Sequence, residues 1–178
     1  MLRVAIIGAG TAGRSFAAAC AAAGFPVILE DVMPAKLRQA EQELAGLAAS
    51  VTLVSTVEDA VRDADLVIDF VPDELESKLE IWSLIDRMAP PRTVLCTPSD
   101  SLSITDLASC TYRAARCVMI RGPLTAPGAL RLLHAAETSP ETLAIANTLF
   151  SALGFTIHPQ PDPDLPMLLK NMRATTIS

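Results

Sequence analysis

Six residues near the N-terminus, Gly8-Ala9-Gly10-Thr11-Ala12-Gly13, have the spacing of a loop that binds phosphate groups. In such a loop the first glycine permits a tight turn and the second lets a pyrophosphate approach the backbone. The third glycine lets a helix pack closely on a strand. A helix that begins here presents free N–H groups and the positive end of its dipole to the phosphates. We therefore predict a dinucleotide site with Gly8, Gly10, Thr11, Ala12 and Gly13 as contacts.

An acidic residue, Asp31, follows Gly13 by 18 positions, at the end of the second expected strand. A carboxylate there can accept hydrogen bonds from both hydroxyls of an adenosine ribose and repels the 2′-phosphate of NADP. Glu30 adds a second negative charge, and no Arg or Lys follows before Lys36. These residues predict NAD as the cofactor. The alternative is a glycine-rich turn that binds nothing or binds another nucleotide.

Short apolar runs that alternate with Ala-, Leu- and Glu-rich segments predict the elements that position these residues. Strands are expected at 2–8, 26–31, 51–55, 65–71, 93–97, 115–121, 129–136 and 155–158, and helices at 11–24, 34–48, 56–63, 74–88, 103–110 and 139–154. The fold class is therefore α/β, a doubly wound, mainly parallel sheet of the Rossmann type in a single domain. Residues 1–158 form this dinucleotide-binding domain. Residues 159–178 form a Pro-rich tail, with a short terminal helix expected at 165–172.

The composition excludes several other classes of protein. The 178 residues are 51% hydrophobic, and 14 Lys and Arg against 20 Asp and Glu give a formal net charge of −6. Such a chain is too apolar to be disordered, and its acidic surface disfavours nucleic acid. No apolar run reaches the roughly 18 residues of a membrane span. We therefore expect a soluble, cytoplasmic protein. The cysteines lack the spacing of a metal site, so we also expect reduced thiols and no metal. They are Cys20, Cys96, Cys110 and Cys117.

Four separated segments resemble the N-terminal NAD-binding domain of the 3-hydroxyacyl-CoA dehydrogenases, in that family's order. They are Val4 to Gly13, Asp65 to Pro72 with Glu74, Leu75 and Lys78, Ser101 to Leu107, and Thr138 to Leu143. The resemblance implies an NAD-dependent oxidoreductase. It also implies cofactor contacts from the glycine loop, Asp31, Asp73 and Lys78, where Asp73 stands in place of the family's usual Glu. The alternative for Asp73 and Lys78 is a solvated helix start.

The same resemblance implies that the family's catalytic residues are replaced. The family's general base, a His, corresponds to Arg121, its Asn to Leu124 and its active-site Ser to Asp100. The Glu that orients the family's His falls at or beside His134. A guanidinium stays protonated and cannot act as a base, so Arg121 is expected to bind a carboxylate, polarise a carbonyl or form a structural ion pair. His134 is either the new proton-transfer residue, with Asp100 or Ser99 as its partner, or an ordinary strand residue.

The segments that the family uses to hold a long acyl-CoA are also reduced. Residues 34–48 predict one helix where the family has a helical hairpin, and the family's all-helical C-terminal domain is missing from this chain. One hypothesis is an oxidoreductase whose rebuilt site, with Asp100, Arg121 and His134, takes a small or carrier-bound hydroxy or keto substrate. Another is a non-catalytic NAD(H)-binding accessory subunit or redox sensor. A homo-oligomer or partner subunit would then replace the missing domain. A fragment of a larger dehydrogenase is the third hypothesis.

Overall fold

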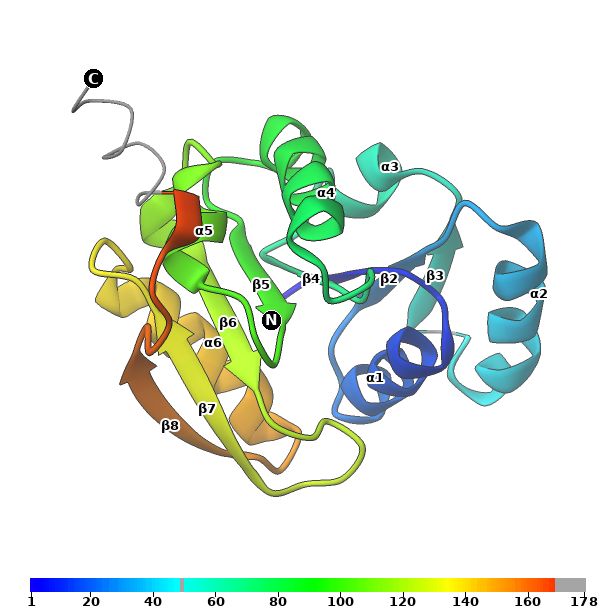
Figure 1. Cartoon of the computed structure of the whole chain (residues 1–178). Coiled ribbons are helices and arrows are strands. Elements are labelled where there is room, and N and C mark those ends of the chain that lie inside the picture. The colour runs from blue at the N-terminus through cyan, green and yellow to red at the C-terminus, as the bar shows by residue number, and fades with distance from the viewer. Residues whose placement is uncertain (49, 169–178) are drawn as a thin grey trace.

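The computed structural model describes residues 1–48 and 50–168 and contains eight strands (Figure 1). The strands are β1 (Val4–Ile7), β2 (Val27–Glu30), β3 (Val51–Val54), β4 (Leu66–Asp69), β5 (Val94–Pro98), β6 (Cys117–Arg121), β7 (Ala129–His134) and β8 (Thr156–Pro161). The α-helices are α1 (Thr11–Ala22), α2 (Pro34–Glu43), α3 (Val57–Val61), α4 (Leu75–Met88), α5 (Ile104–Ser109) and α6 (Pro140–Ala152). Two 3₁₀ turns, η1 (Ala45–Leu47) and η2 (Ala114–Arg116), complete the described elements.

The strands form one sheet in the order β3-β2-β1-β4-β5-β6-β7-β8. The six strands from β3 to β6 run parallel, β7 runs antiparallel to β6, and β8 runs parallel to β7. The order reverses direction between β1 and β4, the place where doubly wound sheets bind their ligands. The predicted fold class, a mainly parallel Rossmann-type sheet, is confirmed.

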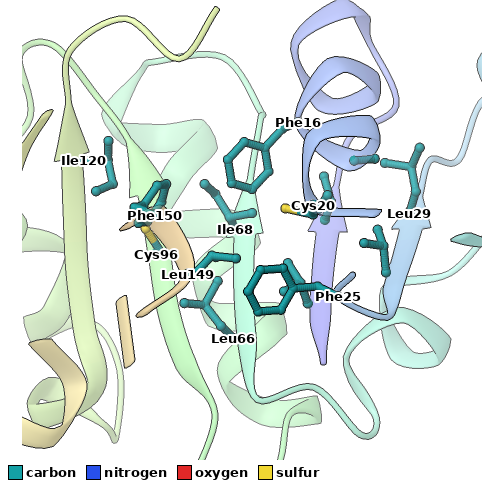
Figure 2. Close-up of a cluster of buried hydrophobic side chains, with 14 of the residues drawn as sticks. Phe16, Cys20, Phe25, Leu29, Leu66, Ile68, Cys96, Ile120, Leu149 and Phe150 are labelled. Atoms are coloured by element: carbon teal, nitrogen blue, oxygen red, sulfur yellow. The ribbon is translucent and has the colours of Figure 1, made fainter. Parts of the chain in front are cut away.

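Helices cover both faces of the sheet, which explains why the parallel strands are almost continuously apolar. On one face α1, α2 and α6 pack on the sheet, and Figure 2 shows Phe16 of α1 and Phe150 of α6 beside Ile68 of β4. The Phe16 and Phe150 rings lie 5.9 Å apart. On the other face α3, α4 and α5 pack on the sheet, with Trp82 of α4 fully buried. These two cores hold the strand ends that carry the candidate site residues.

Side-chain caps fix where three of the helices begin. Thr56, Ser103 and Ser139 each accept a hydrogen bond from the backbone N–H three residues later. Such caps satisfy an N–H group that has no partner within its helix. At the first of them, the bond from Asp59 N to Thr56 Oγ1 measures 3.1 Å.

Two elements differ from the sequence expectation. The helix expected at 34–48 ends at Glu43 and continues only as the η1 turn. The last strand reaches Pro161, three residues into the range assigned to the Pro-rich tail. Thr156 N and Asp162 N donate to Gly128 O and His134 O, so the backbone N–H groups of even-numbered residues point toward β7. Pro159 and Pro161 therefore face away from β7, where a residue without an N–H group costs no sheet hydrogen bond.

Of the terminal helix expected at 165–172, residues 167–168 are helical, and 169–172 lie outside the described residues. Among the residues that the structure describes, no helix combines the length and the apolar character needed to cross a membrane. In the same residues, no group of three or more His, Cys, Asp or Glu side chains is arranged to hold a metal ion.

Candidate dinucleotide-binding site

The glycine loop joins β1 to α1, and its first and third glycines are required for different reasons, backbone conformation at Gly8 and lack of room for a side chain at Gly13. Gly8 has φ +102°, in the region that favours glycine. A Cβ atom on Gly13 would lie 1.8 Å from the backbone oxygen of Gly8. A Cβ atom on Gly10, by contrast, would meet nothing within 4 Å. Gly8 and Gly13 thus make the turn and the close helix packing, and Gly10 leaves open space above the backbone for a phosphate.

The N-terminus of α1 opens onto this space. Gly10 occupies the cap position, and no side chain there accepts a hydrogen bond from the first turn. Backbone N–H groups and the helix dipole are therefore available to an anion. Arg14 holds the loop in place. Its Nη1 donates to Ala9 O at 2.8 Å, and its Nε donates to Glu43 Oε2 at 2.7 Å. This arrangement fits a pyrophosphate.

Asp31 stands at the end of β2, beside the loop. Its Oδ2 accepts from Ala9 N and its Oδ1 from Met33 N, both at 2.8 Å. Each carboxylate oxygen keeps a second lone pair with which to accept a further hydrogen bond. Lys36 Nζ lies 3.9 Å from Oδ2. Asp31 therefore positions the loop and offers acceptors at the point where an adenosine ribose would lie.

Glu30, the neighbour of Asp31, is buried. Burial and the adjacent Asp31 charge raise the pKa of the Glu30 carboxyl to about 7, against a smaller opposing effect of the Gly8 backbone N–H. The second negative charge expected beside Asp31 is therefore only partly present at neutral pH. Most of the repulsion of a 2′-phosphate then falls to Asp31.

A pocket of about 560 Å³ opens next to α1, at the carboxyl edge of β4, β5 and β6. It brings together five of the residues predicted from the sequence as site residues: Thr11, Ala12, Asp73, Lys78 and Asp100. Its remaining lining is mainly apolar or small and comprises Ser15, Phe16, Phe70, Val71, Pro98, Ser99, Ile120, Gly122, Leu124 and Thr125. Phe16 and Phe70 contact each other with ring centroids 5.5 Å apart. A largely apolar pocket with a few polar groups is the usual form of a cofactor site.

Lys78 enters the pocket from α4 and is almost completely buried. Its Nζ lies 2.8 Å from Oδ2 of Asp69, at the end of β4, and Trp82 Nε1 donates to the other carboxylate oxygen at 2.9 Å. A buried ammonium group needs such a partner. Lys78 has three N–H donors, so donors remain after this ion pair for a ligand in the pocket.

Asp73 and Asp100 lie on neighbouring loops at the pocket rim. Asp73 Oδ2 accepts from Asp100 N at 2.9 Å, which ties the loop after β4 to the loop after β5. Ser99 accepts from Leu102 N through its Oγ at 3.0 Å and holds the second loop in shape. Both acidic side chains remain exposed. Two exposed carboxylates thus line the pocket.

The Arg121 guanidinium is bound within the protein, unlike in the two of its expected roles that involve a ligand. Its side chain is buried and donates to Ser99 O, Leu102 O and the carboxylate of Asp164, each at 2.9 Å. The third of its expected roles, a structural ion pair, is the one that the structure shows. Arg121 fastens the loop after β5 and the segment after β8 to the end of β6.

His134 lies away from the pocket, so the expected cluster of Asp100, Arg121 and His134 is not formed. Because β7 is antiparallel, His134 pairs with Val118, whereas Arg131 pairs with Arg121. Three residues of strand, about 10 Å, separate these two positions. The only bond of the His134 ring within the described residues is a contact of Nδ1 with Ala135 O at 3.3 Å.

Sequence reasoning missed three residues that shape the site. Asp69 holds Lys78, Phe70 forms part of the pocket wall, and Asp164 holds Arg121. Asp69 had a visible signal, since it is an acid at the end of an otherwise apolar strand. Asp164 had none, because it lies 43 positions from Arg121 in the segment expected to be a Pro-rich tail.

The fold and the site define the class of this protein. A doubly wound sheet, whose first strand enters a glycine loop and whose second strand ends at an acid, is a Rossmann-type dinucleotide-binding domain. The chain belongs to the family of the 3-hydroxyacyl-CoA dehydrogenase NAD-binding domain, which matches residues 3–51 and 35–157. This is a family of NAD-dependent oxidoreductases, so NAD is confirmed as the cofactor.

Individual relatives support this assignment. The chain is 27% identical over 174 residues to a probable 3-hydroxybutyryl-CoA dehydrogenase of Bacillus subtilis, with 86% of this chain and 60% of that protein covered. It is 31% identical over 170 residues to an L-carnitine dehydrogenase of Burkholderia mallei, with 84% and 52% covered. The fold superposes on (S)-3-hydroxybutyryl-CoA dehydrogenase of Ralstonia eutropha with a TM-score of 0.84 and 24% identity, covering 91% of this chain and 64% of that one. The chain thus spans between half and two thirds of the length of these relatives.

Proposed function

We propose that this chain binds NAD(H) and acts as an NAD(H)-binding module without the proton-transfer chemistry of the dehydrogenases that it resembles. One observation carries the proposal. Within the described residues, no histidine lines the pocket, and the residue at the family's general-base position, Arg121, is held by Asp164 and two backbone carbonyls. Oxidation of an alcohol needs a group that accepts the hydroxyl proton, and a guanidinium cannot do so.

The proposed cofactor contacts follow the two halves of the sheet. Asp31 accepts hydrogen bonds from the adenosine ribose, and the open space at Gly10 with the α1 N-terminus receives the pyrophosphate. Lys78 donates its remaining N–H groups to the second ribose, and Asp73 accepts from it. When bound, NAD⁺ supplies a hydride acceptor at its nicotinamide ring.

A second candidate function is an oxidoreductase with a rebuilt site, and Asp100 favours it. The Asp100 side chain lines the pocket beside Ser99, so its carboxylate is a group there that could accept a proton from a substrate hydroxyl. The pocket of about 560 Å³ suits a small or carrier-bound hydroxy or keto substrate rather than a long acyl chain.

Two measurements separate these functions. Titration calorimetry should give saturable binding of NAD⁺ and NADH and much weaker binding of NADPH. NADH absorbance should then stay constant when the protein is mixed with NAD⁺ and the hydroxy substrates named for its relatives, 3-hydroxybutyryl-CoA and L-carnitine, or with NAD⁺ and small hydroxy acids. It should also stay constant when the protein is mixed with NADH and a panel of small keto acids. Turnover that disappears in Asp100→Asn would favour the second candidate. Failure to bind any nicotinamide dinucleotide would refute both.

A further inference from the structure

The charge of the pocket is carried by three side chains: Asp73, Lys78 and Asp100. The positive charge of Lys78 is matched by Asp69 at 2.8 Å. The other cations near the site are matched in the same way, since Arg121 pairs with Asp164 and Arg14 with Glu43. The carboxylates of Asp73 and Asp100 have no cation against them among the described residues. The pocket therefore carries two uncompensated negative charges.

These two charges lie on the nicotinamide side of the site. The glycine loop follows β1 and Asp31 follows β2, which places the adenosine half of a dinucleotide over β1 and β2. Asp73 follows β4 and Asp100 follows β5, on the opposite side of the point where the strand order reverses. In a doubly wound sheet the second nucleotide lies over this other half.

The two redox forms of the cofactor differ in charge at this end of the molecule. The nicotinamide ring of NAD⁺ is a pyridinium cation. Transfer of a hydride to it gives the neutral dihydropyridine of NADH. A negative pocket stabilises the cation and has no corresponding attraction for the neutral ring. The adenosine and pyrophosphate parts are identical in both forms, so they contribute equally to both binding constants.

We infer that this site favours the oxidised cofactor, and that Asp100 is a determinant of the preference. The inference rests on the proposed NAD(H) binding. The resemblance to the 3-hydroxyacyl-CoA dehydrogenases implies that Asp100 stands at the position of a Ser in that family. This chain then has a carboxylate in place of a neutral side chain. Asp100 and Asp73 are exposed, and a partly screened charge within several ångströms of the ring changes affinity by about two- to tenfold. The ratio of NAD⁺ to NADH would then determine how much of the site is occupied, which suits a redox-sensing module.

The test measures dissociation constants for NAD⁺, NADH and ADP-ribose on the wild-type chain and on Asp100→Asn. ADP-ribose lacks the nicotinamide and reports on the shared part of the ligand. Asp100→Asn should weaken NAD⁺ binding about two- to tenfold relative to NADH, with ADP-ribose binding no weaker than in the wild type. Asp73→Asn keeps an oxygen that can accept from Asp100 N, and it should change the ratio in the same direction.

Asp63→Asn is the matched control, because it removes the same charge from the opposite edge of the sheet, before β4. The control should leave the ratio of the two constants unchanged. Raising the salt concentration should reduce the wild-type preference, since the attraction is screened. An unchanged ratio in both Asp100→Asn and Asp73→Asn, with ADP-ribose still bound, overturns the inference and leaves the proposed function standing. Loss of all three ligands in the wild-type chain overturns both.

Discussion

Nη1 of Arg121, at the end of β6, lies 2.9 Å from Oδ2 of Asp164, three residues beyond β8. The same segment is held by Asp106 of α5, whose carboxylate accepts from Met167 N at 2.8 Å and Leu168 N at 3.0 Å. Asp162 adds bonds from Ser103 Oγ and Thr105 N. Arg121, Asp106 and Asp162 thus hold the segment after β8 against the end of β6 and α5.

Replacement of Arg121 should therefore destabilise the fold. Arg121→Ala leaves Ser99 O and Leu102 O without their donor and Asp164 without its partner. We expect the free energy of unfolding to fall by about 2–4 kcal/mol in urea denaturation. Arg131→Ala, which removes an exposed arginine from the paired position on β7, should change it by less than about 0.5 kcal/mol. Equal effects of the two substitutions would contradict a structural role for Arg121.

The buried pair of Lys78 and Asp69 should show strong energetic coupling. Lys78→Met leaves the Asp69 carboxylate buried with Trp82 as its remaining donor, and should cost about 3–5 kcal/mol. Adding Asp69→Asn removes the unpaired charge and should restore about 2 kcal/mol. A double-mutant cycle from chemical denaturation measures this coupling. Strictly additive effects would mean that the two groups do not interact.

Substitution of Gly13 should lower the stability of the fold, whereas substitution of Gly10 should lower mainly the affinity for the cofactor. Gly13→Ala places a Cβ atom against the Gly8 backbone oxygen, so it should cost about 3 kcal/mol or more of stability. Gly10→Ala has open space and an extended backbone, so thermal stability should change by about 1 kcal/mol or less. Its methyl group occupies the phosphate position, and NADH affinity should fall about tenfold or more. Wild-type affinity in Gly10→Ala would place the pyrophosphate elsewhere.

Glu30 should make stability depend on pH. Burial and Asp31 raise its pKa from 4.5 to about 7 in the folded protein. Between these values the native state binds more protons than the unfolded chain, so the free energy of unfolding falls as pH rises from about 5 to about 7. Glu30→Gln should flatten this slope and be more stable than the wild type at pH 8, by up to about 3 kcal/mol.

The control for this pH series is Glu41→Gln, which removes an exposed acid of α2. It should keep the wild-type dependence on pH. Denaturation curves collected from pH 5 to pH 8 for the three proteins decide the matter. A Glu30→Gln slope identical to the wild type would assign the pH dependence to another group.

The elements and the cofactor loop could be predicted because their signals are local. Three glycines at fixed spacing define the turn between β1 and α1, and Asp31 marks the end of an apolar run. Ser and Thr caps mark helix starts within a residue or two. Each of these features depends on neighbours a few positions away, so the chain can be interpreted without knowledge of its tertiary contacts.

The expected cluster of Asp100, Arg121 and His134 does not form, because the position of His134 depends on the direction of β7. The connection between β6 and β7 has only residues 122–128, too short for the crossover that a parallel strand needs. That length indicates an antiparallel β7, whose C-terminal His134 then lies away from the pocket. The partner of Arg121 could not be found in this way, because the segment after β8 approaches α5 only through tertiary packing.

The prolines of β8 have a consequence for how this sheet meets other chains. Pro159 and Pro161 occupy two of the three positions whose backbone faces outward along β8, at 157, 159 and 161. An incoming strand would find few donors there, so this edge is protected against aggregation by sheet extension. The opposite edge, β3 (Val51–Val54), has no proline. Of the two edge strands, β8 thus has outward donors removed by proline, and β3 keeps its backbone N–H groups.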